Sequence, residues 1–512
     1  MVLVWLIVVL MAGGLLAWMS NTLHRDLPRW IALVTMIVGL LLTVMLWWQY
    51  RASAFTVGAD GWLETYSVSW IPEFGISFSL ALDGLSLLML MLSFFLGAMA
   101  VLISWNEIKD RVGFFHFNLL WVLAGICGVF LTMDLFLLYF FWEVMIIPMY
   151  FLIGIWGHEN RRYAAYKFFI YTQASGLLML LSILALYFVH GSATGQYTYD
   201  YRLLLGTNMD PDTSRWIMLG FMVAFAVKLP VVPLHTWLPD AHSQAPTAGS
   251  LILAGLLLKT GAYGILRFVI PLFPAASHEL APWMMALGVL GILYGAILAF
   301  AQTDLKRLVA YTSVSHMGFV MLGAFSFNEL ALQGVVMQMI THGISTGALF
   351  LIAGILSDRI HTRDIERMGG FWNSMPRLGG ISLVFVMASL GLPGLGNFVA
   401  EFLTLIGAWQ AHRLLTVLGA IGVVGATIYS LRIMQRVFYG AQPLHQSYQL
   451  PDLSLREKLI MIPMVVLIIV LGIMPQYALD TSRAAVVAIL KGDRAIDHDA
   501  PTATIKQGGT HD

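Results

Sequence analysis

The sequence has 512 residues, of which 59% are hydrophobic and 11% are charged, and its formal net charge is zero. Soluble domains carry about 25% charged residues, and the mean hydropathy here is +0.80. These values exclude a soluble domain and predict an integral membrane protein.

Apolar segments long enough to span a bilayer recur along the whole chain. A helix needs about 20 residues to cross the ~30 Å hydrocarbon layer, and the alternating pattern of a membrane β-barrel is absent. The predicted fold is therefore an all-α membrane bundle, and its longest segment has room for two helices. Because no basic residue precedes the first segment, we expect a retained helix there rather than a signal peptide. The fourteen predicted spans are residues 2–19, 29–48, 78–104, 112–132, 135–156, 166–189, 216–235, 247–270, 282–302, 308–325, 330–356, 379–410, 414–436 and 458–476.

Basic residues predict how these helices are oriented. Sixteen Lys and Arg, Lys306 among them, fall in the loops after odd-numbered spans, and five, including Arg267, fall after even-numbered spans. Cytoplasmic loops carry the excess of basic residues. We therefore expect a multi-pass protein of the bacterial cytoplasmic membrane with both termini on the non-cytoplasmic side.

Cofactor-binding motifs are missing from the sequence. Cys127 is the only cysteine, which excludes an intrachain disulfide and a cysteine-ligated cluster within the chain. No GxGxxG or GxxxxGK[ST] loop is present. No redox cofactor or nucleotide site is expected by these routes.

Ionisable residues occur at the middle of several predicted spans. Glu143 lies nine residues past Asp134 and Lys228 twelve past Trp216, which places them about 13 and 18 Å into the layer at 1.5 Å per residue. A charge there costs about 2.5–3.5 kcal/mol on insertion scales, so a functional role is the default expectation. Residues at similar depth on other spans are Lys259, His316, His342 and Glu401.

Such a row predicts a proton relay in the plane of the membrane. Glu143 and Lys228 carry opposite charges at one depth, and the proton affinity of a lysine can be tuned where that of an arginine cannot. For His316 or His342 taken singly, a satisfied polar group inside the bundle stays an equal alternative. Gln338, His342 and Ser345 share one helix face, which fits a proton path or helix–helix contacts.

The seventh span is predicted to break beside its lysine. Pro230 follows Lys228 by two residues, and Pro233 and Pro239 are expected to keep the helix open. Broken backbone at membrane depth is tolerated only where it is buried in protein or lines a water-filled cavity. We therefore expect water beside Lys228 and His235, with a simple proline kink as the alternative.

The twelfth span repeats this feature, because a Gly/Pro-rich stretch, residues 391–396, precedes Glu401. Paired interrupted helices indicate an inverted-repeat transporter. The separation from Glu143 to Lys228 is 85 residues, and that from His316 to Glu401 is also 85. Helices 4–8 and 9–13 are thus predicted to be two inverted five-helix repeats with broken helices 7 and 12.

Four regions follow from this division. Residues 1–111 form the N-terminal helices 1–3, residues 112–272 the first repeat, residues 281–440 the second repeat, and residues 441–512 the last helix with a short polar tail.

Four stretches carry a resemblance to a known family: FFWEVMIIPMYFLIGIWG, KLPVVPLHTWLPDAHSQAPTAGSLILAGLLLKTGAYG, LKRLVAYTSVSHMG and GLPGLGNFVAEF. They resemble the antiporter-like membrane subunits of respiratory complex I, the NADH–quinone oxidoreductase, from about residue 80 to 440. By this resemblance, Glu143 and Lys228 match the ion pair of the fifth and seventh helices, Lys259 the central lysine and Glu401 the group toward the exit. The connecting polar positions of the family fall on His235, His316 and His342.

The resemblance implies a translocase subunit that moves protons while other subunits oxidise NADH and reduce quinone. It implies no cofactor in this chain, with NADH, FMN, iron–sulfur clusters and quinone in partner subunits. The expected partners are other complex I subunits, especially neighbouring antiporter-like membrane subunits, and the lipid bilayer, but not nucleic acid.

A second function stays open, a subunit of a multisubunit Na+/H+ antiporter or of a membrane-bound hydrogenase. Glu401 favours complex I, because the antiporters and the distal complex I subunit usually carry lysine there. The short tail also leaves no room for the long lateral helix of that distal subunit.

Overall fold

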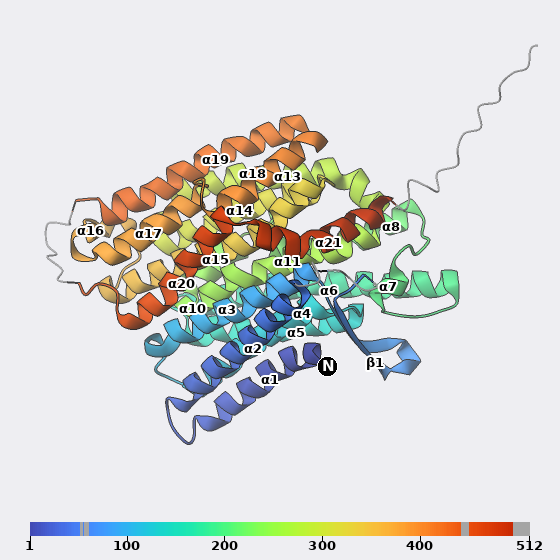
Figure 1. Ribbon diagram of the computed structural model, residues 1–512, viewed down its shortest axis with the longest axis horizontal. Helices are drawn as coiled ribbons and strands as arrows, with labels where there is room; N and C mark the ends of the chain where they lie inside the picture. Colours follow the sequence, from blue (N-terminus) through green and yellow to red (C-terminus); the bar gives the residue numbers. More distant parts are fainter. Residues whose placement is uncertain (52–54, 56–60, 442–449, 495–512) are drawn as a thin grey trace, which may run out of the picture.

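The computed structural model describes residues 1–51, 55, 61–441 and 450–494. Long helices run roughly along one direction, horizontal in Figure 1, with α1 at one edge of the bundle and α19 at the other. The N-terminus, the β-hairpin and the C-terminal end of α21 point to the same end of the bundle, on the right of Figure 1.

The first half of the chain contains a β-hairpin beside its helices. The elements are α1 (Val2–Ser20), α2 (Leu27–Arg51), β1 (Glu64–Ile71), β2 (Ile76–Leu82), α3 (Gly84–Glu107), α4 (Val112–Leu131), α5 (Leu135–Trp156), α6 (Arg161–Thr194), α7 (Tyr201–Leu204), α8 (Pro211–Lys228), α9 (Trp237–Gln244), α10 (Thr247–Ile252), α11 (Leu258–Gly264) and α12 (Ile270–Leu272).

In the described part of the second half, all the regular elements are helices. Its elements are α13 (Pro274–Ala301), α14 (Leu305–Ala324), α15 (Glu329–Ile360), α16 (Phe371–Ser374), α17 (Pro376–Ser389), α18 (Gly396–Ala411), α19 (Arg413–Ile433), α20 (Leu455–Ile473) and α21 (Gln476–Arg494).

Polar side chains fix where several helices begin. Asp83 caps α3, Asp134 caps α5, Asp304 caps α14 and Asn328 caps α15, each accepting hydrogen bonds from backbone N–H groups of the first turn. Those N–H groups have no partner within the helix, so the caps set the ends of the membrane helices.

The mostly helical bundle confirms a membrane protein of the all-α type, with one local exception. The predicted third span, 78–104, begins inside β2, which pairs antiparallel with β1 from Ile76 opposite Ile71 to Leu82 opposite Glu64. Large apolar residues alternate with the small residues Ser77, Ser79 and Ala81 along Ile76–Leu82, which is the period of a strand rather than of a helix. The hairpin is anchored to the bundle by the Ser77 N–H, which donates to Asp134 Oδ2 at 2.9 Å.

Each predicted span contains a helix, but not all are long apolar helices. Across the described ranges, ten helices are long and apolar enough to cross a membrane, and the pair α20 and α21, bent by 70°, makes an eleventh. The others are α8 and α14, which are helical but more polar, and segment 379–410, which divides into α17 and α18. The total of fourteen spans stays a prediction.

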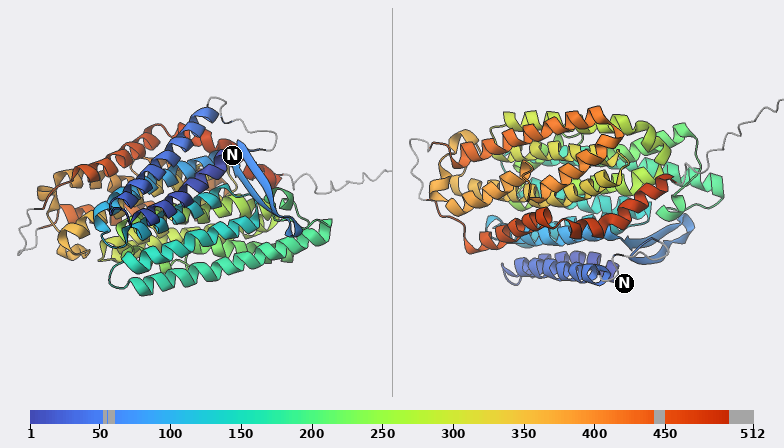
Figure 2. Two further views of the ribbon diagram at one scale, coloured as in Figure 1. Left: turned by 90° about the horizontal axis from the view of Figure 1, so that it is seen from below. Right: turned by 45° about the horizontal axis from the view of Figure 1, so that its top comes forward.

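The C-terminal tail forms a helix that the sequence reasoning missed. Residues 477–512 were expected to be a short polar tail, yet α21 packs against α3, α12 and α15. It follows α20 across the face of the bundle that is toward the viewer in Figure 1, and Figure 2 shows the same pair from two other sides. Its polar composition hid an apolar face that includes Val486 and Ile489, both buried.

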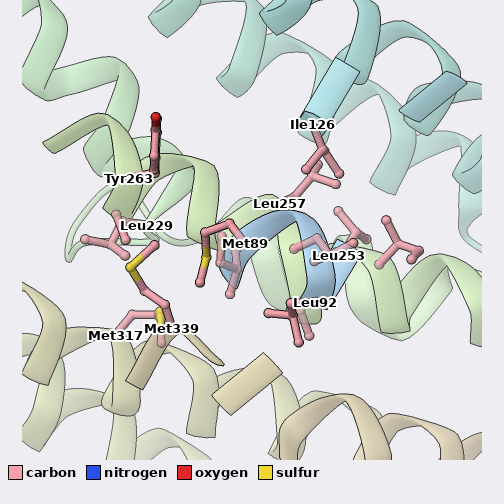
Figure 3. Packing of buried hydrophobic residues seen from close by; sticks show 14 of the residues in the cluster. Met89, Leu92, Ile126, Leu229, Leu253, Leu257, Tyr263, Met317 and Met339 are labelled. Carbon is pink, nitrogen blue, oxygen red and sulfur yellow. The ribbon is translucent and has the colours of Figure 1, made fainter. Parts of the chain in front are cut away.

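The centre of the bundle is formed by α15 and the segment α10–α12, the two membrane helices whose apolar stretches are entirely buried. Figure 3 shows Leu253 and Leu257 of this segment among side chains from α3, α4 and α15. Burying apolar side chains here stabilises the bundle through close packing rather than through exclusion of water, because lipid is itself apolar. The ionisable residues are held inside this packing.

Candidate functional site

Lys228 is the last residue of α8, and the helix ends there as predicted. The backbone from residue 229 to 236 is not helical, and α9 begins at Trp237. Pro239 does not keep the chain open as expected, because it lies in the first turn of α9. Proline is tolerated there since an N–H in the first turn has no partner within the helix.

The Lys228 side chain is fully buried among aromatic rings. Its Nζ lies 5.4 Å from the Trp142 ring and 5.1 Å from the Phe168 ring, and it has no hydrogen-bond partner among the described residues. Aromatic faces attract a cation without fixing it. The ammonium is therefore free to turn toward another partner.

Glu143 lies on α5 next to Trp142 and is half-buried. Gln173 Nε2 of α6 donates to Glu143 Oε1 at 3.1 Å. Lys228 Nζ does not reach this carboxylate, so the expected pair is not in direct contact in this conformation. The ammonium of Lys228 contacts the ring of Trp142 instead. This contact keeps Lys228 near α5, although the ion pair with Glu143 is not formed.

Lys259 lies next to α8 on the buried α11. A Cβ added to Gly261 would fall 3.1 Å from Lys228 Cβ and 2.6 Å from the Phe225 carbonyl oxygen, so glycine allows the two helices to approach closely. The two lysines are thus carried by helices in contact.

The membrane segment that carries Lys259 is not a regular α-helix. Two π-helical turns, Leu253–Leu257 and Ile265–Val269, flank α11. Such widened turns are frequent at functional sites because they displace backbone groups from the regular ladder. Here Lys259 Nζ donates to the Ala254 carbonyl oxygen, which gives the buried ammonium one backbone partner.

The second partner of Lys259 is His342 of α15. Lys259 Nζ lies 2.6 Å from His342 Nδ1, and both side chains are fully buried. An ammonium donates and an unprotonated ring nitrogen accepts, so His342 Nδ1 is the acceptor when Lys259 is charged. The other nitrogen, His342 Nε2, has no partner in the described part of the chain.

His316 of α14 continues this line toward α18. Its ring centroid lies 5.6 Å from that of His342, and its Nδ1 lies 2.8 Å from Glu401 Oε1. Ser389 Oγ and the Tyr429 hydroxyl each lie 3.2 Å from His316 Nε2. Both ring nitrogens of His316 therefore have partners, as proton transfer through an imidazole requires.

The predicted break in the twelfth span is present and precedes Glu401 in the chain. Helix α17 ends at Ser389 and α18 begins at Gly396, with Gly391 and Gly394 at φ +79° and +95° between them. Only glycine takes such angles without strain. The turn brings Gly391 within 3.5 Å of Glu401 Oε2, measured from an added Cβ, and the carboxylate is 3% exposed.

His235 does not join this line. It lies in the backbone break after α8, and its ring packs at 5.5 Å from that of Tyr294 and 6.3 Å from that of Tyr311. Its Nδ1 has no partner among the described residues. It is buried beside α13 and α14, and its role as a relay position stays a prediction.

Two corrections concern basic residues that were counted with the loops. Lys306 is fully buried in α14, and its Nζ donates to the Ala245 carbonyl oxygen at 3.1 Å. Arg267 is 4% exposed and forms an ion pair with Asp83. Both stand within a few residues of a helix end, and a count of charges along the chain does not show that a side chain turns inward.

His242 was missed by the sequence reasoning, although it lies in a quoted motif. It is fully buried on α9, and its ring stacks on Phe350 at 4.4 Å. Neither ring nitrogen has a partner among the described residues, and both Lys306 and Lys259 act on it electrostatically. It lies two residues past Asp240 on α9, and this position gives no sequence signal of its burial.

A polar hollow of about 510 Å³ lies at the end of the bundle that carries the basic loops. Its lining includes Asn106, Glu107, His158, Asp358 and Glu457. Glu107 Oε1 accepts from the Thr247 N–H at 2.8 Å. Burial, with nearby positive charge, lowers the pKa of the loop residue His158 to about 4, so this histidine is neutral near pH 7.

These contacts define a class of protein: a helical membrane protein with a buried line of ionisable side chains, Lys259, His342, His316 and Glu401, across four helices. Within the described ranges, no three His, Cys, Asp or Glu side chains gather as they would around a metal ion.

Known proteins of this class match the chain over most of its length. The transmembrane family described as NADH:quinone oxidoreductase/Mrp antiporter matches residues 132–428. NADH-quinone oxidoreductase subunit M of Escherichia coli is 54% identical over 493 residues, which are 95% of this chain and 97% of that protein. The chain therefore belongs to the NADH:quinone oxidoreductase/Mrp antiporter family of membrane subunits.

Solved structures agree with this assignment. A chain of respiratory complex I from Thermus thermophilus has a TM-score of 0.87 and 30% identity, covering 96% of this chain and 99% of that one. A chain of the Mrp complex from a Dietzia species has a TM-score of 0.81 at 20% identity, covering 97% and 98%, which shows a shared fold alone.

Proposed function

We propose that this chain is the proton-translocating membrane subunit of NADH:quinone oxidoreductase. It moves H+ along buried lysine, histidine and glutamate side chains while other subunits oxidise NADH and reduce quinone. The observation that carries this proposal is the line from Lys259 through His342 and His316 to Glu401, in which two close contacts, at 2.6 and 2.8 Å, flank two imidazoles that pack edge to face.

The path begins at the polar hollow. Neutral His158 and the Glu107 carboxylate give protons access from that surface, and the buried Lys306 and His242 lead inward to Lys259. Each of these groups can gain or lose a proton, and in this proposal water molecules join them into one path. The hollow lies where the basic loops are, which is the cytoplasmic side under the positive-inside rule.

In this proposal, the position of the Lys228 side chain controls how strongly Lys259 holds its proton. When Lys228 turns toward Glu143, its positive charge moves away from α11, and Lys259 holds its proton more strongly. When it turns back, repulsion between two buried cations favours release from Lys259 to His342. The aromatic cage of Lys228 permits this movement, because a ring face attracts the cation without a directional hydrogen bond.

The chain takes no direct part in electron transfer in this proposal. The enzyme activity belongs to the assembly, a proton-translocating NADH:quinone oxidoreductase, and NADH, FMN, the iron–sulfur clusters and quinone are bound by partner subunits. Neighbouring antiporter-like membrane subunits are its nearest partners.

Two inverted repeats build the pathway, and corresponding backbone hydrogen bonds support them. The Leu135 N–H donates to the Tyr199 carbonyl, and the Tyr201 N–H to the Met133 carbonyl. In the second half, the Leu305 N–H donates to the Arg363 carbonyl and the Ile365 N–H to the Thr303 carbonyl. The same two-bond bridge thus joins α5 to the chain after α6, and α14 to the chain after α15.

These repeats correspond to residues 112–272 and 281–440, preceded by residues 1–111 and followed by residues 441–512. The membrane is the bacterial inner membrane. Both ends of the described chain face its non-cytoplasmic side, opposite the basic loops.

The alternative, a subunit of a multisubunit Na+/H+ antiporter or of a membrane-bound hydrogenase, is disfavoured by Glu401. Its carboxylate accepts from His316 where antiporters carry a lysine, and a lysine could not accept that hydrogen bond. The similarity also differs, since identity is 54% to the complex I subunit but 20% to the Mrp chain.

The test compares what drives proton movement. Inverted membrane vesicles containing this chain with its own partner subunits should acidify when NADH is added, and rotenone-like quinone-site inhibitors should abolish the signal. Acidification driven by a Na+ gradient without NADH would instead establish the antiporter.

A further inference from the structure

A cationic hollow lies where the end of α2 meets α21. It has a volume of about 800 Å³, and its lining includes Trp47, Arg51, Tyr477, Asp480, Arg483 and Lys491. Three of these side chains are basic and one is acidic. The hollow therefore presents a net positive charge at the end of the bundle where α2 leaves the membrane.

Arg51 is the central cation of this hollow. Its guanidinium lies 5.1 Å from the Trp47 ring and 4.6 Å from the Tyr477 ring, and no carboxylate pairs with it among the described residues. Arg483 is paired with Glu329 at 3.3 Å, and Asp480 accepts from Gln476. The positive charge of Arg51 is thus available to an anion.

An apolar groove begins one helical turn deeper. It has a volume of about 470 Å³, and its lining side chains are all apolar. It runs between α2, α3, α15 and α20, and Ala478 of α21 closes one end. Its lining includes Leu40, Val44, Leu88, Phe95 and Leu467.

The two hollows are joined along α2. Val44 lines the groove and Trp47 lines the cationic hollow, three residues apart on one helix face. Trp47 Nε1 donates to Thr481 Oγ1 of α21 at 3.0 Å, which fixes this junction. Arg51 lies seven residues past Val44, about 10 Å along the helix axis.

We propose that this composite site binds one phospholipid with an anionic headgroup. The headgroup phosphate lies against Arg51 and Lys491, and one acyl chain occupies the groove. The spacing of charge above an apolar channel matches a lipid lying parallel to the helices. Tryptophan and tyrosine are enriched at this depth, and lysine and arginine form charge-assisted hydrogen bonds with phosphate groups.

The lipid fills a gap that the protein leaves open. Helix α21 bends 70° away from α20, so side chains of the two helices cannot close the groove between them. Ile340 and Ile344, which flank His342 on α15, form its inner wall. A bound acyl chain therefore packs directly against the buried helix α15.

The test measures lipid retained by the intact assembly. The whole complex is purified in detergent, and bound phospholipid is counted by native mass spectrometry. We expect one anionic phospholipid to survive delipidation in the wild type. Arg51→Gln removes one charge-assisted contact and should lower its retention about tenfold, and Val44→Phe, which narrows the groove, should do the same.

Arg413→Gln is the matched control. Arg413 stacks on Trp409 at 5.7 Å and is exposed on the protein surface, but it does not line the groove. Its variant should retain the lipid. Equal retention in the Arg51, Val44 and Arg413 variants would overturn the proposal.

Inorganic phosphate separates a lipid from a free anion. Excess phosphate should not displace the bound molecule, because the acyl chain anchors it. Complete displacement by phosphate, with no loss in Val44→Phe, would show that the hollow is an anion site without a lipid, and would also overturn the proposal.

Discussion

His316 Nδ1 lies 2.8 Å from Glu401 Oε1, although 85 residues separate the two in the sequence. The contact joins α14 to the second half of a broken membrane segment, and both side chains are almost fully buried. An imidazole N–H that donates to a carboxylate can pass its proton to it. In the proposed path, this contact is the step that links the central histidines to the exit side.

Loss of His316 should stop this step. His316→Gln keeps a hydrogen-bond donor for Glu401 but cannot relay a proton, so NADH-driven acidification of inverted vesicles should fall about tenfold or more, within the range that a positioned acid–base group contributes. His316→Gln combined with Glu401→Gln should cost no more than either change alone, because two members of one path are not additive. If the two losses of pumping, expressed as free energies, added up in the double variant, the two residues would lie on separate paths.

Lys259 must titrate rather than supply a fixed charge. Lys259→Arg keeps the positive charge beside His342, yet arginine does not release its proton in proteins. We expect an assembled complex with strongly reduced pumping. Acidification at the wild-type rate, measured in the same inverted vesicles, would rule out Lys259 as a proton carrier.

The Glu143 and Lys228 side chains are expected to act together without being in permanent contact. Glu143→Ala and Lys228→Ala should both assemble and both lose most of the quinone reduction that is coupled to pumping. Glutamine has the length of glutamate but not its charge, so Glu143→Gln should lose as much pumping as Glu143→Ala. Near-normal pumping in any of the three would contradict a switch.

Gly261 should be sensitive to size alone. In Gly261→Val, the added Cβ would meet the Phe225 carbonyl oxygen at 2.6 Å and the Leu229 nitrogen at 2.8 Å, so α8 must move away from α11. We expect a cost of about 1–3 kcal/mol, seen as a lower thermal midpoint of the purified complex, together with weaker pumping. Gly380→Ala is the control, because no atom lies within 4 Å of its added Cβ.

Much of the fold could be predicted from the sequence because membrane spans carry a strong signal. Every predicted apolar segment contains a helix, and the breaks after Lys228 and before Glu401 follow from proline and glycine. The strand Ile76–Leu82 was missed because its apolar residues joined the following helix in one hydrophobic run. Helix α21 was missed because its polar face masked a buried apolar one.

The sequence predicted at which membrane depth the site residues lie, but not which of them are in contact. Depth along a helix identified Lys259, His316, His342 and Glu401, because charges at mid-membrane are costly. Which side chains touch depends on helix rotation and on local π-helical turns, and neither follows from spacing. His242 was passed over for the same reason, since nothing in its sequence position shows that it faces inward.

The most direct measurement is proton pumping by Glu401→Gln, with Glu401→Lys beside it. Glutamine has nearly the size of glutamate but cannot carry a proton, so NADH-driven acidification by the assembled variant should be largely lost. Lysine can carry a proton, so Glu401→Lys should keep part of it. Wild-type acidification by Glu401→Gln, with normal levels of assembled complex, would contradict the account, because the line from Lys259 would then end without a proton acceptor.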